Sequence, residues 1–449
     1  MKHLSFWALI LINVALVFPM GAMASDEGLC KATAMKALKT SEELKRVASY
    51  PTMAVYTKAS GGFAIVSTTG STPRILAYSS SGTFSATTGN PGFNWWMRAM
   101  GKASLKETTK PDPSRFAPAV EPLITTRWGQ NEPCRYMCPF LEYNPDLSQY
   151  GVYIPDSTHN AVGCGPAAMA QLMNYYKFPK HGTGSASVVV KYDQANVTLS
   201  VDFEQATYDW DSMLDDYSGD YSEDNGRAVA TLCYHAAVAA KTNWTRLGGG
   251  TFDENILNAF ITHFNYCDSA RLLARPLYDE PTWMETIYGM LTAGHPVLYS
   301  GKDINFEVGI LVGHNFIIDG YDENGLVHVN WGWHGDQDGY FDIATLTVGK
   351  LTFNDWQGMY VNLYPNRENI LGDVNCDGYV TGSDVTAIYQ YILFNDTTFA
   401  STSDVNNDGH ITASDVTAIY NILLGLEKND VVESRAKAPV SYFLRRHPC

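Results

Sequence analysis

The 449-residue chain is predicted to belong to the α+β class, and three features of its sequence support that class. Residues 121–365 form the largest block, in which helical patterns come first and short strands dominate after about residue 296. That order favours an α+β domain with two lobes. Residues 25–105 mix a helical segment with short strands, which indicates a small α+β domain. Residues 371–425 repeat a loop-and-helix pattern, which indicates a small all-α module.

The N-terminus has the parts of a secretory signal peptide. Lys2 and His3 give a short basic start, residues 4–19 are nearly all apolar, and an Ala-x-Ala cleavage site ends at Ala24. We expect residues 1–24 to be removed before Ser25, and an uncleaved membrane anchor is the alternative. No later apolar run is long enough to span a bilayer. The protein is therefore expected to be secreted or associated with the cell surface.

Residues 25–118 are interpreted as an N-terminal domain followed by a linker. Residues 27–49 have a helical pattern, residues 53–84 have the pattern of strands separated by Gly and Ser turns, and residues 90–101 have that of a short helix. A polar, Pro-rich stretch follows at 102–122. Such stretches connect folded units and are accessible to proteases.

Cys164 is a candidate nucleophile. It lies between Gly163 and Gly165 where a helix begins, and Pro166 fits the first turn because its missing N–H costs nothing there. The helix macrodipole favours a thiolate at this end and is expected to lower the thiol pKa. A thiolate is the competent nucleophile, whereas a lone buried cysteine is more often structural. The apolar face of the helix contains Ala167, Ala168, Leu172, Met173 and Tyr176.

A candidate base and a candidate orienting residue lie on one predicted hairpin. His314 opens a strand over residues 314–321, Asn324 and Gly325 form the turn, and residues 326–331 return. The hairpin brings His314 and Asn330 to one edge, where Asn330 could orient the imidazole as the third member of a triad. Trp331 and Trp333 could exclude water from that hydrogen bond.

These motifs resemble the streptopain family of papain-like cysteine peptidases. The resemblance rests on Gly-Cys-Gly at 163–165, Gly-His at 313–314, the segment HVNWGW at 328–333 and the order Cys, His, Asn along the chain. It implies a two-lobed papain-like domain over residues 119–366. The implied catalytic residues are Cys164, His314, Asn330, Gln130 and Trp331.

The same resemblance extends beyond the catalytic triad. Gln130 stands where the family has a Gln that helps to bind the oxyanion, together with the N–H of Cys164. Gly313 is assigned to substrate binding, and residues 248–250 are a weaker candidate for a substrate-binding loop. The segment between Gln130 and Cys164 departs from the family in its length and in its pair Cys134 and Cys138. These two cysteines could pair, whereas metal binding is less expected because no second Cys/His pair follows at a matching distance.

The N-terminal block resembles the pro-domain of this family at residues 61–84 and 90–97. The resemblance implies that residues 25–118 comprise a domain that occludes the cleft until it is cut off, and the linker. An accessory domain without that role is the alternative.

Two acidic 12-residue loops recur 31 residues apart within residues 370–426. Gly378 and Gly409 occupy position 6, where the loop must turn sharply, and an apolar helical pattern follows each loop. Oxygen ligands at alternating positions fit Ca²⁺. The candidate ligands are Asp373, Asn375, Asp377, the Tyr379 carbonyl, Thr381 and Asp384 in the first loop, and Asp404, Asn406, Asp408, the His410 carbonyl, Thr412 and Asp415 in the second.

This duplicated pattern resembles a dockerin, a calcium module that binds cohesin domains. The resemblance implies structural Ca²⁺ and a cohesin-like protein partner, and no cofactor is expected for catalysis. Acidic turns between helices are the alternative reading of the loops. Residues 427–449 form a polar tail with no assigned role.

The composition limits the function further. The formal net charge of −16 and a pI near 5.1 make nucleic acid an unexpected partner, so protein or peptide substrates are favoured. The sequence thus predicts a secreted cysteine endopeptidase made as a zymogen. A thiol acyltransferase or transpeptidase on the same thiol is one alternative, and a catalytically dead surface or scaffold binding protein is another.

Overall fold

A computed structural model describes residues 26–70, 72–101, 108–146, 149–156, 158–245, 248–305, 310–343, 357–366, 371–375, 380–394, 399 and 402–426. The predicted signal peptide, the tail at 427–449 and the candidate ligands Asp377 and Tyr379 lie outside these residues. In the described ranges, no helix combines the length and the apolar character needed to cross a bilayer.

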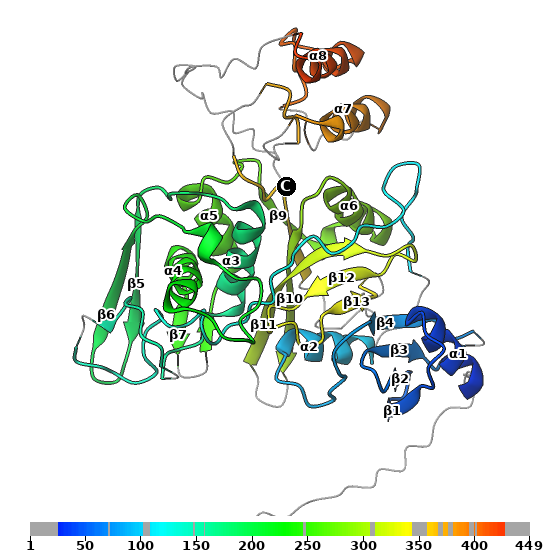
Figure 1. Cartoon of the computed structure of the whole chain (residues 1–449), viewed down its shortest axis with the longest axis horizontal. Coiled ribbons are helices and arrows are strands. Elements are labelled where there is room, and N and C mark those ends of the chain that lie inside the picture. Colours follow the sequence, from blue (N-terminus) through cyan, green and yellow to red (C-terminus); the bar gives the residue numbers. More distant parts are fainter. Residues whose placement is uncertain are drawn as a thin grey trace, which may run out of the picture.

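A ten-stranded antiparallel sheet connects the N-terminal domain to the large domain (Figure 1). Its strand order is β1-β2-β3-β4-β13-β12-β11-β10-β14-β9. The connection is the pairing of β4 with β13, in which Tyr78 faces Tyr340 and Ala77 faces Phe341. The rings of Tyr78 and Tyr340 stack with centroids 5.0 Å apart. The sequence predicted two separate domains but not a sheet shared between them.

The N-terminal domain packs one helix on its strands and presents a second helix to the large domain. Its elements are α1 (Glu27–Ala37), β1 (Lys45–Ser49), β2 (Met53–Thr57), β3 (Phe63–Ser67), β4 (Ile75–Ser79) and α2 (Pro91–Met100). The helical prediction for residues 27–49 is correct for α1 only. Lys39 adopts the left-handed conformation just after α1, and residues 45–49 pair with β2 as a strand. Pairing between strands therefore overrides the local helical preference at β1.

The helical lobe of the large domain lies to one side of the sheet (Figure 1). It comprises α3 (Cys164–Tyr176), β5 (Ser185–Lys191), β6 (Asn196–Asp202), the short helix η2 (Trp210–Ser212), α4 (Glu223–Ala239), β7 (Asn243–Thr245), β8 (Gly248–Gly250) and α5 (Asp253–His263). The helix predicted to begin near Cys164 is α3, and its residues from Gly165 to Asn174 are all buried. α3 packs on α4, on α5 and on the sheet, which holds Cys164 at the junction of the two lobes.

The sheet lobe carries the predicted hairpin. It comprises β9 (Arg271–Ala274), the short helix η3 (Arg275–Leu277), α6 (Glu280–Thr292), β10 (Val297–Asn305), β11 (Ile310–Tyr321), β12 (Val327–Asn330), β13 (Gly339–Phe341) and β14 (Gln357–Val361). The turn between β11 and β12 contains Gly325 at a φ of 85°. Asn330 pairs with Ile317, so the hairpin places Asn330 beside β11 near its middle.

The hydrophobic core follows the lobes. One cluster fills the helical lobe and continues into the C-terminal module, which contains α7 (Gly382–Phe394) and α8 (Ala413–Leu423). A second cluster is shared by the sheet lobe and the N-terminal domain, and it joins Phe93 and Trp96 of α2 to Trp331 and Phe341. The N-terminal domain is therefore bound by core packing as well as by strand pairing.

The β4–β13 connection is testable through Gly339. A Cβ at this position would lie 2.5 Å from the Tyr78 carbonyl oxygen, so Gly339→Val should separate β4 from β13. We expect amide hydrogen exchange over residues 75–79 to accelerate roughly ten-fold or more, because lost pairing exposes backbone groups to water. Hydrogen exchange read by mass spectrometry measures this. Gly358→Ala is the control, since its Cβ would meet a Leu272 methyl 3.0 Å away that can move. Unchanged exchange in Gly339→Val would show that the connection is dispensable.

Candidate active site

The thiol of Cys164 lies at the open N-terminus of α3. Gly163 precedes the helix with a φ of 99°, and a Cβ there would lie 2.9 Å from the carbonyl oxygen of Gly249. No side chain caps this end of the helix. The first N–H groups of α3 therefore surround the thiol without a competing side-chain acceptor, as an anion-binding helix end requires.

Among the residues that the structure describes, no basic side chain is hydrogen-bonded to the Cys164 thiol. Its Sγ lies 3.9 Å from Oδ1 of Asn315. Burial raises the pKa of the thiol, and backbone hydrogen bonds from Asn315, Gly165 and Cys164 oppose that rise only in part. The sequence-based expectation of a lowered pKa is therefore wrong for this arrangement, because desolvation outweighs the helix end when no cation lies nearby.

His314 is turned away from Cys164. Its Nε2 lies 2.8 Å from the carbonyl oxygen of Trp331, to which it donates, and its Nδ1 has no partner among the described residues. The ring is 3% exposed, and burial lowers the pKa of His314 to about 4, with the Trp331 carbonyl opposing that shift. The imidazole is thus neutral near pH 7 and is not hydrogen-bonded to the thiol.

Helix α2 of the N-terminal domain lies directly against the His314 ring. A Cβ at Gly92 would be 2.3 Å from Cδ2 of His314 and 2.5 Å from Cε3 of Trp331. The helix is held there by its N-cap residue, Asn90, whose Oδ1 accepts from the Phe93 N–H and whose Nδ2 donates to the Asp336 carbonyl. Only a glycine at position 92 allows this approach, and the approach fixes the orientation of His314.

The described hydrogen bonds of Asn330 are made to residues other than His314. Its Nδ2 donates to the carbonyl of Thr126 at 2.8 Å, and its Oδ1 accepts from Nε2 of Gln171 and from the Gly332 N–H. Gln171 also accepts from Oγ1 of Thr126. Asn330 therefore ties α3 to the segment that carries Gln130. Gln171 was missed from the sequence, although a side-chain amide among the apolar residues of α3 was the signal for it.

The other predicted site residues lie around Cys164 with different contacts. The carbonyl of Gln130 accepts from the Val162 N–H at 2.9 Å, which places Gln130 next to the residue two positions before Cys164. Gly313 is exposed and faces Lys302 across β10 and β11. Trp331 is fully buried, and its Nε1 donates to the Gln337 carbonyl. The Gly248–Gly250 strand, β8, lies beside Gly163 through Gly249.

A polar cluster next to Cys164 was not found from the sequence. Asp253, the first residue of α5, is buried and accepts from Ser300, Lys302 and Asn315. Asn315 is the residue that contacts the thiol. The position of Asn315 directly after His314 was its only signal, and Asp253 lies 89 residues along the chain from Cys164, with no motif to connect the two.

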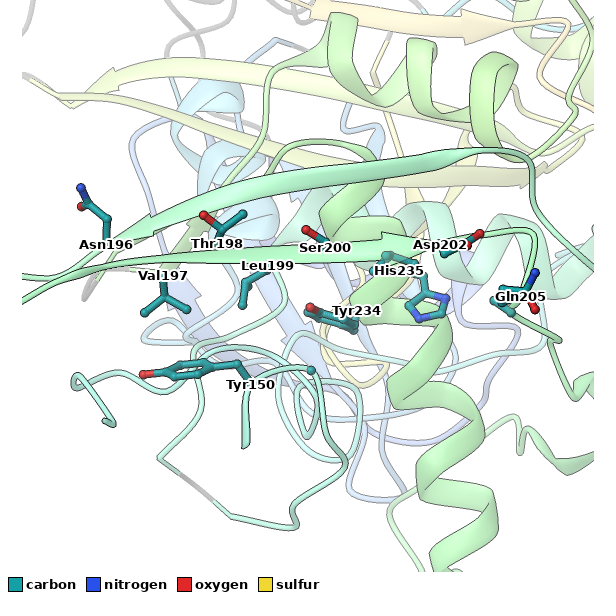
Figure 2. Close-up of a pocket in the computed structure, with 13 residues that line it drawn as sticks. Tyr150, Asn196, Val197, Thr198, Leu199, Ser200, Asp202, Gln205, Tyr234 and His235 are labelled. Carbon is teal, nitrogen blue, oxygen red and sulfur yellow. The ribbon is translucent and has the colours of Figure 1, made fainter. Parts of the chain in front are cut away.

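A surface hollow lies away from these residues. It has a volume of about 680 Å³ and lies along β6, and Tyr150 and the α4 residues Tyr234 and His235 also line it. Figure 2 shows the side chains of β6 alternating, with Thr198 and Ser200 on one side of the strand and Val197 and Leu199 on the other. Neither Cys164 nor His314 lines this hollow.

The second acidic loop gathers its candidate calcium ligands over one turn. The Asp404 carboxylate accepts from the N–H groups of Asp408 and Gly409, and Asn406 Nδ2 donates to Asp408 Oδ2 at 3.0 Å. Asp415 accepts from the Asn406 and Thr412 N–H groups. Within the described residues, no three His, Cys, Asp or Glu side chains converge as metal ligands. The donors are nevertheless hard oxygen atoms of the kind that Ca²⁺ takes, so the residues fit this ion.

The first loop is described at its two ends. Asp384 is fully buried and accepts from the N–H groups of Val374, Asn375 and Thr381. Asp373 is buried as well. Asp384 thus occupies the same place in its loop as Asp415 does in the second loop, which supports the predicted duplication.

The cysteines of the helical lobe are free thiols in this structure. Cys134, Cys138 and Cys233 are buried together, and Cys134 is hydrogen-bonded to Cys233 rather than paired with Cys138. The pairing of Cys134 with Cys138 therefore stays a prediction.

Family descriptions match three parts of the chain. Residues 128–341 match the peptidase C10 family, residues 24–103 match the Spi protease inhibitor and residues 371–424 match the dockerin type I domain. These matches confirm the predicted peptidase, inhibitory pro-domain and dockerin-like module, and the domain boundaries themselves stay predictions.

Similar proteins agree with these descriptions. Streptopain of Streptococcus pyogenes serotype M28 is 29% identical over 333 residues, which cover 70% of this chain and 81% of streptopain. The thiol protease/hemagglutinin PrtT of Porphyromonas gingivalis is 26% identical over 67% of this chain and 34% of its own length.

Two solved structures from Prevotella intermedia support the same assignment. A fragment of prointerpain A has a TM-score of 0.63 and 34% identity, and covers 73% of this chain and 100% of that chain. Active interpain A has a TM-score of 0.50 and 37% identity, and covers 57% of this chain and 99% of that chain. The predicted papain-like α+β fold is confirmed. The chain belongs to the peptidase C10 family of streptopain-like cysteine endopeptidases, with an inhibitory pro-domain before the peptidase and a dockerin type I domain after it.

Proposed function

We propose that this protein is a secreted zymogen that hydrolyses peptide bonds through Cys164, His314 and Asn330. The observation that carries the proposal is the placement of Cys164 at the uncapped start of α3, between two lobes, with His314 on the neighbouring strand. In the reaction, Sγ of Cys164 attacks the scissile carbonyl carbon while His314 takes the thiol proton and returns it to the leaving amine. Water then hydrolyses the acyl-enzyme.

Oxyanion binding is assigned to the backbone N–H of Cys164 and to the side-chain amide of Gln130. The hydrogen bond between the Gln130 carbonyl and the Val162 N–H keeps Gln130 near the start of α3. Donors already in position where negative charge develops stabilise a tetrahedral intermediate. Gly313, which is exposed on β11, is proposed to contact the substrate, and Trp331 to support His314 through packing.

Asn330 is proposed to act after His314 turns toward the thiol. In the latent arrangement Asn330 holds Thr126 and Gln171, and both contacts fix α3 relative to the strand that carries His314. A hydrolase is favoured over a transpeptidase, because the chain resembles peptidases and no described feature selects an amine over water.

The pro-domain is proposed to keep the enzyme latent by holding the His314 ring under α2 and on the Trp331 carbonyl, away from the Cys164 thiol. Removal of α2 would release the ring from the Gly92 backbone, and the imidazole could then exchange the Trp331 carbonyl for the Cys164 thiol. The linker offers exposed backbone at residues 112–114 and 118–119, whereas Phe116 between them is buried. We propose that maturation cuts between about residues 105 and 121.

The dockerin type I domain is proposed to bind two Ca²⁺ ions and a cohesin-like protein. Asp373, Asn375, Asp384, Asp404, Asn406, Asp408, the His410 carbonyl and Asp415 are described candidate ligands, and Asp377 and Tyr379 are proposed from the sequence alone. Bound Ca²⁺ would neutralise carboxylates that repel one another when the loop is compact. Binding through this domain would hold the peptidase on an extracellular or cell-surface assembly.

Catalytic assignments are tested by single substitutions. Cys164→Ala and His314→Ala should reduce casein hydrolysis to background, since they remove the nucleophile and the base. Asn330→Ala and Gln130→Ala should reduce kcat by roughly 10²-fold, because each removes one orienting or oxyanion group. Kinetics on the matured enzyme, with melting curves to show intact folding, measure both effects. Normal turnover in Cys164→Ala would contradict the nucleophile assignment.

Latency is tested at Gly92. Gly92→Ala should push α2 off His314, because its Cβ would lie 2.3 Å from the ring. The chain should then be active before cleavage, and cleavage should release its pro-domain several-fold faster than in the unmodified chain. Gel electrophoresis and N-terminal sequencing of the product follow the release. Gly101→Ala, at the C-cap of the same helix, is the matched control, since its Cβ would meet only carbonyls of that helix, those of Met97 at 3.3 Å and Arg98 at 3.6 Å. A Gly92→Ala chain as latent as the unmodified chain would refute the proposal.

Calcium binding is tested in the full chain with Cys164→Ala, which prevents self-cleavage. Calorimetric titration should detect two Ca²⁺ ions, and Asp404→Ala combined with Asp408→Ala should leave one. EDTA should accelerate hydrogen exchange in α8, because metal binding contributes free energy to folding of this small module. Peptide hydrolysis by the matured enzyme should continue in EDTA. Asp211→Ala, an exposed change in the peptidase, is the control. Equal exchange in α8 with and without Ca²⁺ would contradict the prediction.

A further inference from the structure

The polar cluster beside Cys164 has no place in the mechanism above. It consists of Asp253 at the start of α5, Ser300 and Lys302 on β10, and Asn315 on β11, and we call it the Asp253 cluster. Ser300 faces Asn315 and Lys302 faces Gly313 in the strand register, so these residues share one face of the sheet. His314 projects to the opposite face, toward α2.

The carboxylate of Asp253 is fully engaged within the cluster. Ser300 Oγ lies 3.1 and 3.2 Å from its two oxygens, Asn315 Nδ2 donates at 3.2 Å, and Lys302 Nζ lies 2.7 Å from Oδ2. The Asp253 side chain is 7% exposed. A basic substrate side chain would therefore have to displace existing donors before it could bind this carboxylate.

Lys302 is the member of the cluster that reaches solvent. Its side chain is 27% exposed, and the ammonium group has three N–H donors, of which the carboxylate of Asp253 is the one described acceptor. Gly313 lies opposite Lys302 and carries no side chain, and a Cβ there would lie 3.4 Å from Cγ of Lys302. Gly313 therefore places no side chain over the stem of Lys302.

The cluster connects Lys302 to the nucleophile through short contacts. Asn315 joins them, since its Oδ1 is 3.9 Å from Sγ of Cys164 and its Nδ2 is 3.2 Å from Asp253. Followed atom by atom, this path limits the separation of the ammonium from the thiol to roughly 14 Å, which about four residues of extended chain would span. Lys302 therefore lies within reach of a peptide that extends from Cys164 in its direction.

We propose that Lys302 is a specificity-determining residue, which binds an oxygen-bearing substrate side chain (Asp, Glu, Asn or Gln) near the scissile bond. The Asp253 carboxylate holds the ammonium in place. This proposal rests on the proposed function, because it requires the peptide to be bound at Cys164.

The chemistry of the ammonium separates this substrate class from the others. A carboxylate or amide oxygen can accept a charge-assisted hydrogen bond from Nζ. A Lys or Arg side chain would place a like charge beside it, and an apolar side chain would desolvate it without a partner. Because the Asp253 carboxylate already offsets the ammonium charge of Lys302, this ion pair should bind substrate amides as well as carboxylates.

The test uses the full chain, with a site for an unrelated protease placed in the linker so that the pro-domain can be removed. Values of kcat/KM are measured on peptides varied over three residues on each side of the cleavage site. At one of these peptide positions, kcat/KM for Glu and for Gln should exceed kcat/KM for Leu by roughly ten-fold or more. Lys302→Met should abolish that preference. Asp253→Asn should instead raise kcat/KM for Glu peptides relative to Gln peptides, because the ammonium charge of Lys302 is then no longer offset.

Lys191→Met, on the exposed end of β5, is the matched control and should leave every preference unchanged. A purely structural role for the cluster would lower turnover on all peptides equally. A preference for Lys or Arg, or an unaltered profile in Lys302→Met, would overturn the inference while leaving the proposed function intact. No hydrolysis of any peptide by the unmodified enzyme would instead refute the proposed function. If Lys302→Met fails to fold, the opposite shift expected in Asp253→Asn still decides the matter.

Discussion

The arrangement of the site depends on one close contact, between the backbone of α2 at Gly92 and the ring of His314. Because Gly92 has no Cβ, the helix can lie on the imidazole, whose one hydrogen-bond partner among the described residues is the Trp331 carbonyl. The other features of the latent site follow from this contact. His314 stays neutral because it is buried, and the Cys164 thiol keeps its proton because no cation is near enough to offset burial.

Two sets of interactions hold α2 in that position, and neither lies in the linker. β4 extends the sheet of the peptidase through β13, and Phe93 and Trp96 enter the hydrophobic cluster that also contains Trp331 and Phe341. A cut in the linker would remove neither. It would end only the high effective concentration that a covalent connection provides. Release of the pro-domain after cleavage is therefore a dissociation from a core-like interface, which is slow unless the freed pro-domain is also degraded or unfolded.

The sequence was sufficient where structure follows from local pattern. The helix that begins at Cys164, the hairpin around Gly325 and the two loop-helix repeats depend on nearby residues, and all were predicted. It was insufficient where distant segments meet. β1 looked helical until β2 paired with it, and the β4–β13 connection has no signal in either strand. The direction of His314 depends on a glycine 222 residues away, which no spacing rule reveals. The Asp253 cluster was missed for the same reason.

Helix α3 connects the thiol to the C-terminal domain. Tyr176, at its last turn, hydrogen-bonds to Nδ1 of the buried His295, and Nε2 of His295 lies 3.1 Å from the carbonyl of Asn375 in the first acidic loop. His295 also stacks on Tyr364, and Phe399 lies next to both rings. The dockerin domain is therefore seated on the helical lobe as part of one hydrophobic cluster. Its contacts reach the end of α3 opposite Cys164, where they add to the stability of the lobe. The geometry at the thiol is set by other residues, namely Gly163, Asn315 and Gln171. That separation allows one chain to combine a dockerin type I domain with a peptidase whose chemistry needs no metal.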